Sequence, residues 1–182
     1  MPAVLIEIAR LLLDTIGTLL GVALLLRAYM NWVGMPSRNP LAQFAIALTD
    51  WIVRPLRRVI PAAGRWDTAS LVAAYVVALV MMMLTLVLVG AAPSDWPMAR
   101  MLYQAVLHLL RWGLYTVLFL TIVHVVFSWI NPYAPVAPAV AMLVRPFLAP
   151  FQRILPLIGG IDLSPALLLV VVNVLLLLLN ST

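Results

Sequence analysis

The two histidines are the side chains best suited to proton transfer or metal binding, and their spacing favours neither. His108 and His124 lie in apolar surroundings 16 positions apart, which on one helix turns them to nearly opposite faces. No HExxH pattern is present, and the chain has no cysteine that could supply a thiolate. We therefore expect no metal site and no bound cofactor.

Nucleophilic chemistry has equally little support. Ser128 and Ser164 have no convincing base near them, and the GxSxG pattern of serine hydrolases is missing. The formal charge is +5, but no basic stretch is long or interleaved with aromatic residues as a nucleic-acid groove requires. The sequence thus favours neither an enzyme nor a nucleic-acid-binding protein.

Charged residues inside long apolar stretches are stronger candidates, because an ionisable group in a membrane is costly and usually paired. One face of the first long helix, which includes the residues just before its apolar stretch, collects the charged and small residues Glu7, Arg10, Asp14, Gly17, Gly21 and Ala28. The two glycines form a GxxxG pattern, which favours close helix packing. A comparable stripe on the third helix consists of Gln104, His108, Arg111 and Tyr115.

These two stripes predict an ion pair. When Trp32 is aligned with Trp129, which ends the third stretch, Asp14 and Arg111 lie at the same depth. We predict that these two residues pair near the outer face of the membrane. The pair could be a transport site or a structural clamp. The clamp is favoured, because the other polar residues do not line up into a crossing path.

The elements that position these residues belong to a membrane protein. Of the 182 residues, 65% are hydrophobic and 9% are charged, against about 25% charged in soluble domains. Four stretches approach the roughly 17–25 residues that cross a bilayer as a helix: they are 14–32, 71–90, 112–130 and 166–179. All 14 prolines lie outside them. The sequence therefore predicts an all-α membrane protein with four transmembrane helices.

Arginine supplies all 11 basic residues, and its distribution predicts the orientation. Eight arginines lie in or beside the segments 33–69 and 131–163, and three lie at the other ends of the stretches. By the positive-inside rule, these two segments face the cytoplasm and both termini lie outside.

The two cytoplasmic segments contain nearly the same motif. RPLRRVIP at 54–61 aligns with APFQRILP at 149–156, and the register continues from Asp67 to Asp162. Internal similarity of this kind indicates a repeat. We interpret the chain as two repeats with a boundary near residue 92, so that they cover 1–92 and 93–182.

Each repeat is predicted to consist of a helix, a proline-rich loop and a second helix. Two crossings return the chain to its starting side of the membrane. The two copies therefore have the same orientation and are related by an axis along the membrane normal.

Six short motifs are distinctive: FSWINPYAP (127–135), RPFLAPFQRILP (145–156), GGIDLSP (159–165), NP (39–40), RPLRRVIP (54–61) and GRWDTAS (64–70). With them the sequence resembles the YggT family, and the resemblance covers nearly the whole chain. The family usually carries an acidic residue just before the first proline of the arginine-proline segment. Here Asp50 and Trp51 stand ahead of that segment in the first copy, and Arg145 precedes Pro146 in the second.

The resemblance implies a multi-pass protein of the bacterial inner membrane. Relatives in the family are associated with division-site or nucleoid organisation and with biogenesis of membrane complexes. In some bacteria they are associated with ion uptake and osmotic tolerance.

Each arginine-proline segment is predicted to form a rigid cytoplasmic shelf, whose apolar residues enter the headgroup boundary while its arginines reach phosphates. We call these two segments the arginine shelves. Their arginines are Arg54, Arg57 and Arg58 in the first copy, and Arg145 and Arg153 in the second. Two uses remain open, namely anchoring to anionic lipid headgroups and recognition of a protein partner.

The shelves lead into the following helices through a local motif. Ser164 is expected to cap a helix whose first residue is Pro165, with Asp162 adding negative charge at the positive end of the helix dipole. Asp67 and Ser70 are expected to do the same in the first copy.

Three classes of function remain. The first is a non-enzymatic scaffold or assembly factor in envelope organisation, division or membrane-complex biogenesis, linked to osmotic stress. The second is an oligomeric channel or transporter subunit for ions such as potassium. The third, a membrane enzyme, lacks the motifs it needs. We rank them in that order, and expect as partners the bilayer with its anionic headgroups and either another membrane protein or a second copy of this chain.

Overall fold

The computed structural model describes residues 2–92, 96–155 and 162–181, and the described chain is helical. Its six helices are α1 (Pro2–Val33), α2 (Pro40–Leu56), α3 (Thr68–Leu88), α4 (Met98–Ile130), α5 (Ala137–Ile154) and α6 (Ser164–Asn180). Three of them, α1, α3 and α4, are long and apolar enough to cross a membrane, and α6 is a shorter apolar helix. The all-α class is confirmed for the described chain, three helices are candidate membrane spans, and the fourth crossing stays a prediction.

The helices α1 and α4 are longer than the spans predicted for them. They contain 32 and 33 residues, which corresponds to about 48 Å of helix against about 30 Å of hydrocarbon. The prediction began at Asp14 and Trp112 because hydropathy falls ahead of these residues. Glu, Arg, Gln and Leu nevertheless favour helix, so the helices extend further toward their N-termini than the apolar spans do.

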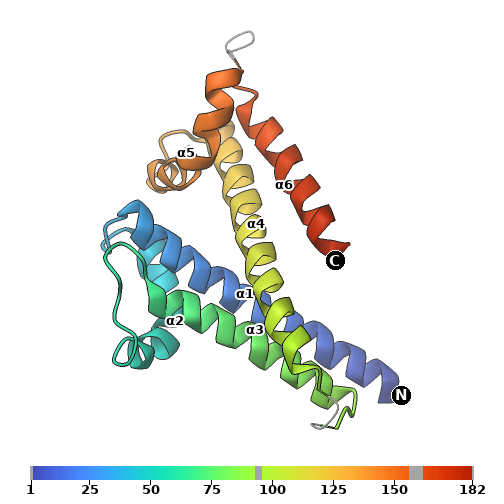
Figure 1. The fold of residues 1–182 in the computed structure, drawn as a ribbon. Coiled ribbons are helices and arrows are strands. Elements are labelled where there is room, and N and C mark those ends of the chain that lie inside the picture. Colours follow the sequence, from blue (N-terminus) through green and yellow to red (C-terminus); the bar gives the residue numbers. More distant parts are fainter. Residues whose placement is uncertain (1, 93–95, 156–161, 182) are drawn as a thin grey trace.

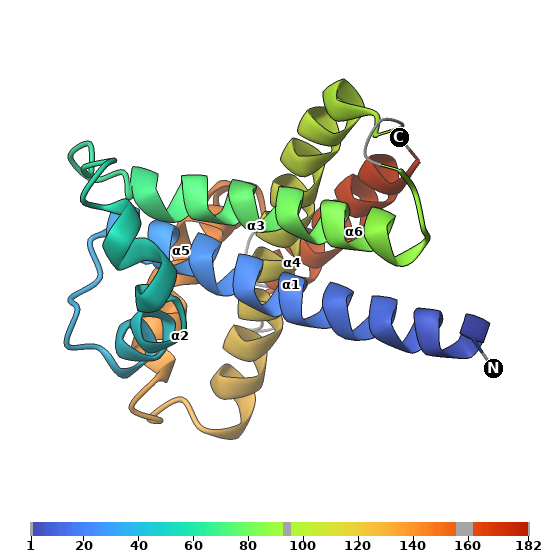
Figure 2. The same cartoon turned by 90° about the horizontal axis from the view of Figure 1, so that it is seen from below.

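The six helices form two similar three-helix units (Figure 1). In the first unit α1 and α3 run antiparallel, and α2 packs against both. In the second unit α4 and α6 run antiparallel, and α5 packs against both. The two units meet where α4 crosses α1 and α3, as the turned view also shows (Figure 2).

The two segments predicted as proline-rich loops each contain a helix, which corrects the prediction. Helix α2 starts at Pro40, where the side chain of Asn39 accepts the backbone N–H of Leu41 at 3.0 Å. Pro55 lies in its last turn, and α5 continues through two internal prolines. Proline removes one hydrogen bond and bends a helix, but both helices are amphipathic and are held by packing. The second shelf is therefore helical as far as Ile154, whereas the first is helical to Leu56 and continues in turns.

Close packing at the crossing of the units depends on the small residues of α1. Gly17 and Gly21 are buried, and a side chain at Gly21 would overlap the indole ring of Trp112 on α4. A side chain at Gly17 would meet Met81 on α3. The expected close packing of this face is thus present at the glycines, whereas Asp14, one turn earlier, is exposed.

Candidate functional site

A buried arginine lies where the three helices of the first unit meet. Arg27, near the end of α1, is 7% exposed. Its Nη1 donates to Thr49 Oγ1 at 3.0 Å, and its Nη2 donates to Asp50 Oδ1 at 3.1 Å. Its Nε lies 3.7 Å from Asp67 Oδ2. One guanidinium group therefore joins α1 to α2 and to the start of α3.

Asp67 completes this network. It is 1% exposed and caps α3, accepting from the hydroxyl of Ser70 at 2.7 Å and from its backbone N–H at 3.4 Å. Arg57 donates its Nη2 to the same carboxylate at 2.7 Å. The four charged groups, Arg27, Arg57, Asp50 and Asp67, balance to zero net charge. A buried charge that is paired and hydrogen-bonded in this way avoids most of its desolvation cost.

The network also sets the protonation of Asp67. Burial by itself would raise the pKa of its carboxyl group. The hydrogen bonds from Arg57 and Ser70 and the positive charge of Arg57 outweigh burial, so the pKa lies below its ordinary value of 3.8. Asp67 is therefore ionised at neutral pH, as an N-cap carboxylate should be.

The second unit has a related but weaker arrangement. Asp162 accepts from Gln152 Nε2 at 2.8 Å and from the backbone N–H of Ser164 at 2.8 Å. Gln152 and Asp162 are ten positions apart, as are Arg57 and Asp67. Desolvation would raise the pKa of Asp162, but these hydrogen bonds and the charge of His124 lower it. In the second unit Gln152 and His124 thus act on Asp162, whereas in the first unit the two arginines Arg57 and Arg27 act on Asp67.

The residues of the helix-entry motif lie at the starts of α3 and α6. Helix α6 begins at Ser164, with Pro165 in its first turn, so Ser164 is the first helical residue and not the cap that the sequence predicts. The backbone N–H of Ser164 donates to Asp162, and its hydroxyl has no hydrogen-bond partner in the described structure. Pro156 and Gly159, which belong to the repeated motif, lie outside the described residues.

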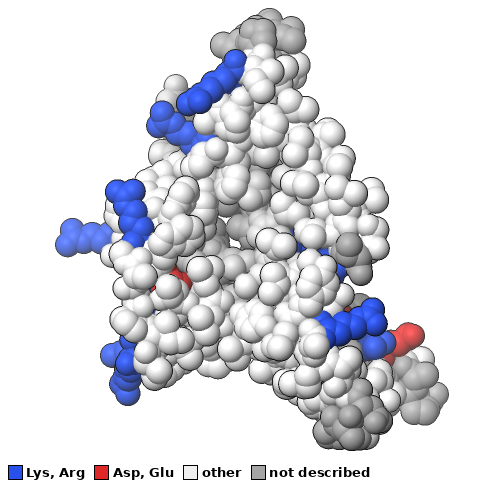
Figure 3. Space-filling view, in the orientation of Figure 1, with Lys and Arg blue, Asp and Glu red and all other residues white. Residues whose placement is uncertain are grey.

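The arginine shelves face outward at the same end of the molecule. Arg54, Arg58, Arg145 and Arg153 are exposed. Arg57 differs, because its guanidinium group binds Asp67 while its side chain stays 43% exposed. Figure 3 shows arginines exposed along this side and a separate basic group at the end that carries the N-terminus. The shelves are thus available for contact.

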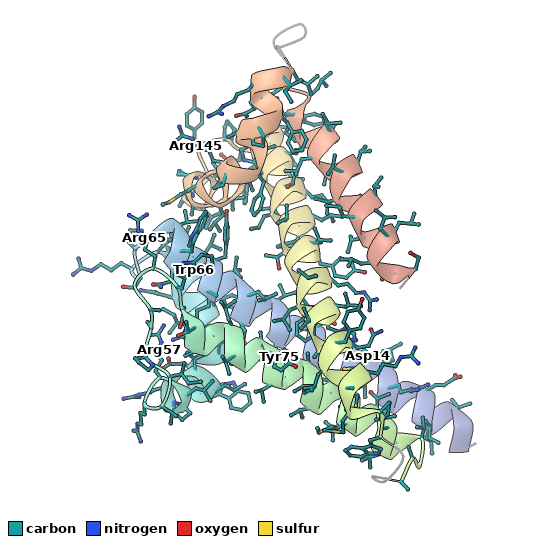
Figure 4. All side chains as sticks on the ribbon, in the orientation of Figure 1. Asp14, Arg57, Arg65, Trp66, Tyr75 and Arg145 are labelled. Atoms are coloured by element: carbon teal, nitrogen blue, oxygen red, sulfur yellow. The ribbon has the colours of Figure 1, made fainter. Side chains whose placement is uncertain are left out.

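Asp14 and Arg111 do not pair with each other among the described ion pairs. Arg111 instead donates its Nη2 to the backbone carbonyl of Leu179 at 2.6 Å, which ties α4 to α6. Asp14 lies near the crossing of the units (Figure 4) and lines a mostly apolar cavity of about 390 Å³ between α1, α3 and α4. Trp112 packs on Gly21, two helical turns from Asp14. The Asp14–Arg111 pair stays a prediction.

A second, larger cavity separates the two units. It is an apolar groove of about 1120 Å³, lined by α1, α4, α5, α6 and the start of α3. Four aromatic rings line it in a row: Trp66 and Trp32 are 6.2 Å apart, Trp32 and Tyr29 5.9 Å, and Tyr29 and Phe147 5.4 Å. The hydroxyl of Tyr29 donates to the carbonyl of Leu143 at 2.7 Å and so links α1 to α5.

Sequence reasoning missed the network around Arg27 and the aromatic row. An arginine within the last two turns of an apolar helix is a signal for a buried charge, but its partners lie 22, 23 and 40 positions away. In the described ranges, no group of three His, Asp or Glu side chains is placed to hold a metal ion.

The three long apolar helices indicate an integral membrane protein. A model of the CCB3/YggT family matches the chain twice, over residues 6–88 and 103–182. The chain belongs to the CCB3/YggT family.

Similar proteins come from several bacteria. The protein YggT of Escherichia coli strain K12 is 34% identical over 164 residues, which covers 90% of this chain and 84% of that protein. Protein PA0392 of Pseudomonas aeruginosa is 35% identical over 156 residues, covering 85% and 79% respectively. Both are described as uncharacterized proteins, so they identify the family and no activity. No solved structure matches the chain.

Proposed function

We propose that this chain is a non-enzymatic protein of the bacterial inner membrane that acts as a scaffold or assembly factor. The observation that carries the proposal is the pair of arginine shelves, which stand on amphipathic helices at one end of the membrane-spanning helices. The first shelf is held to α1 and α3 through Arg27 and Asp67. A surface held in this way is preorganised for binding, since little ordering cost remains when a partner docks.

The exposed side chains of the shelves suit a binding surface. Trp51 on α2 is 69% exposed and Val59, just beyond it, is 81% exposed, while Ile154 at the end of α5 is 75% exposed. Large apolar side chains beside arginines are enriched in protein interfaces and also occur on helices that lie in the membrane interface. The scaffold proposal assigns this surface to a protein partner, with anionic headgroups as its second contact.

The proposal includes a topology. The four crossings are α1, α3, α4 and α6, with the shelves in the cytoplasm and both termini outside. The repeats then run parallel. The excess of arginine at the shelf end supports this orientation. Helix α6, with 17 residues, measures about 26 Å and would span a bilayer only with local thinning.

The cellular process is proposed from the resemblance to the YggT family alone. On that basis the scaffold would serve envelope organisation, division or the biogenesis of a membrane complex, and its loss would lower osmotic tolerance.

The proposal can be tested by photocrosslinking in cells. A photoreactive amino acid is placed at Val59 or at Ile154, and at Leu177 as a control on the exposed face of α6. We expect both shelf positions, but not the control, to capture the same protein, which mass spectrometry then names. Arg58→Glu should abolish that capture while the chain stays in the membrane fraction. Capture of lipid only, or of the same proteins at all three positions, would rule out a specific shelf partner.

A channel or transporter subunit remains the second candidate. The observation in its favour is the cavity near Asp14, whose lining includes the polar side chains of Gln104 and His108. It takes second place because the larger groove between the units is apolar. The test is potassium flux into proteoliposomes. A flux that Asp14→Asn abolishes, at an unchanged protein level, would favour the channel over the scaffold.

A further inference from the structure

The groove between the two units is too large and too apolar to stay empty in a membrane. Its volume of about 1120 Å³ exceeds the roughly 300–1,000 Å³ of small-molecule pockets. The residues that line it are uncharged and mostly aliphatic, among them Leu25, Leu71, Leu114, Leu120 and Leu175. The space-filling view shows a hollow between the units (Figure 3). A cavity with such a lining favours hydrocarbon over water.

One end of the groove has the character of a membrane interface. The row of Trp66, Trp32, Tyr29 and Phe147 lies there, at the end that carries the shelves. Trp and Tyr prefer this level of a bilayer, because their rings are apolar and their N–H or O–H groups bind water or headgroups. Trp32 and Trp66 are 39% and 56% exposed. The groove therefore extends from an interfacial mouth into the hydrocarbon layer.

Two arginines stand beside this mouth. Arg65 directly precedes Trp66, and Arg145 directly precedes Pro146, and both of these neighbours line the groove. Figure 4 shows Arg65 and Arg145 at the same end of the molecule, with Arg65 beside Trp66. Both arginines are exposed, and neither belongs to an ion pair in the described part of the chain. Their guanidinium groups are thus free to bind an anion, and arginine is well suited to phosphate.

We propose that the groove binds one anionic glycerophospholipid, with an acyl chain between α1 and α4 and its phosphate on Arg65 and Arg145. The lipid lies between the two units, beside the crossing at which α4 packs on α1 and α3. A transmembrane helix or a second copy of this chain would fill the hydrocarbon part but would bring no phosphate to the mouth. This inference concerns the groove, and it holds whether or not the shelves bind a protein.

Gly113 is a position at which a substitution can fill the groove, and so test the proposal. It lines the groove on α4, and a side chain added there would meet open space within 4 Å. Gly113→Phe should therefore fill the groove without a clash at Cβ, and it replaces a glycine in a helix with a better helix former. Gly113→Ala is the matched control that leaves most of the volume open.

The first measurement is native mass spectrometry of the full chain in detergent. The chain is incubated with equal amounts of phosphatidylglycerol and phosphatidylcholine that have identical acyl chains. We expect one retained phosphatidylglycerol in the wild type and in Gly113→Ala, and its loss in Gly113→Phe. Equal retention of both lipids, unchanged in Gly113→Phe, would mean non-specific surface lipid and would overturn the proposal.

The second measurement tests the mouth. Arg65→Gln combined with Arg145→Gln should lower the preference for phosphatidylglycerol by roughly fivefold for each arginine, about 25-fold in all. Arg10→Gln combined with Arg38→Gln removes the same charge from exposed positions outside the groove and the shelves, and should leave the preference unchanged. An equal loss in both double variants would show a general effect of charge, and the mouth would then not be the site.

A third measurement does not depend on how the Phe variant folds. A phosphatidylglycerol with a photoreactive acyl chain is crosslinked to the wild type, and the labelled peptides are identified. We expect labelling of α4 between Leu110 and Leu120. Labelling spread over the exposed faces of α6 would contradict the proposal. A dimer in detergent that Gly113→Phe abolishes would assign the groove to a second copy instead.

Discussion

Arg27 is the residue on which the first unit depends. A charge at this depth is tolerable only because three oxygen-bearing side chains surround it, and each of them comes from α2 or from the cap of α3. Removing one member of such a set is more costly than the net contribution of the set suggests, because the remaining charges stay buried without a partner. The network is therefore a sensitive point for mutation.

We expect Arg27→Ala to destabilise the protein by about 3 kcal/mol, since loss of one partner of a buried pair costs roughly 3–5 kcal/mol and Arg57 still binds Asp67. Thermal unfolding in detergent, followed by the loss of monodisperse protein, measures the change. Arg38→Ala, at an exposed position, is the control and should stay within about 0.5 kcal/mol of the wild type. Equal midpoints for both variants would contradict a structural role for Arg27.

Asp67 predicts a defined dependence of stability on pH. Its pKa in the folded state lies below the ordinary value of 3.8. The ionised carboxylate therefore contributes stability that is complete above about pH 4 and is lost as the pH falls through the folded pKa. The difference in unfolding midpoint between wild type and Asp67→Asn should be constant from about pH 7 to about pH 5 and shrink below about pH 3.8. A difference that already shrinks above about pH 5 would mean that the pKa is raised instead.

The residues that could be predicted are the ones that act locally. Asp67 and Asp162 accept hydrogen bonds from residues two or three positions further on, and the motifs GRWDTAS and GGIDLSP contain that information. Arg27 acts across more than twenty positions, and its partner depends on how α2 lies on α1. Packing of that kind is not encoded in any short stretch of one sequence.

At the scale of the helices, the crossing of α1 and α4 is set by one glycine and one tryptophan. Gly21 lets the indole ring of Trp112 lie directly on the backbone of α1. Small residues at such crossings permit close van der Waals packing, which is the main attraction between helices in lipid. Next to Trp112, Arg111 donates to the backbone carbonyl of Leu179 and so joins α4 to α6 beyond this crossing.

We expect Gly21→Ala to destabilise the protein by about 1–3 kcal/mol, as overpacking usually does. Trp112→Leu added to Gly21→Ala should recover part of that loss, because it removes the ring that the new methyl group meets. Gly113→Ala, where the methyl group meets open space, is the control and should not destabilise. Unfolding midpoints of the four proteins in one detergent give the answer. Additive losses in the double variant would show that the two residues do not interact.

Hydropathy located the apolar part of each long helix and left out the polar turns before Asp14 and Trp112. Those turns are helical because backbone hydrogen bonds continue through charged residues as well. The prediction also treated each proline as the end of a helix, which is wrong for three of them. Pro55, Pro146 and Pro150 lie inside amphipathic helices, where packing of the apolar face compensates for the missing hydrogen bonds.

At the scale of the whole molecule, the proposed orientation can be tested because the chain has no cysteine. Single cysteines at Arg58, Tyr133 and Ser181 occupy exposed positions in the described chain. A membrane-impermeant maleimide applied to cells with a permeable outer membrane should label Ser181→Cys. It should reach Arg58→Cys and Tyr133→Cys only after the inner membrane is opened. Labelling of Arg58→Cys in intact cells would show that the topology is the opposite of the one proposed.

The location of the buried charges in the sequence bears on the order of synthesis. Arg27 and all of its partners lie between residues 27 and 67, and a chain emerges from the ribosome with its N-terminal part first. By the time α3 has been made, every charge of the network has its counter-charge within the same nascent segment. The first unit can therefore leave the insertion machinery with its buried network already neutral, and the later half of the chain is made against a surface that already exists.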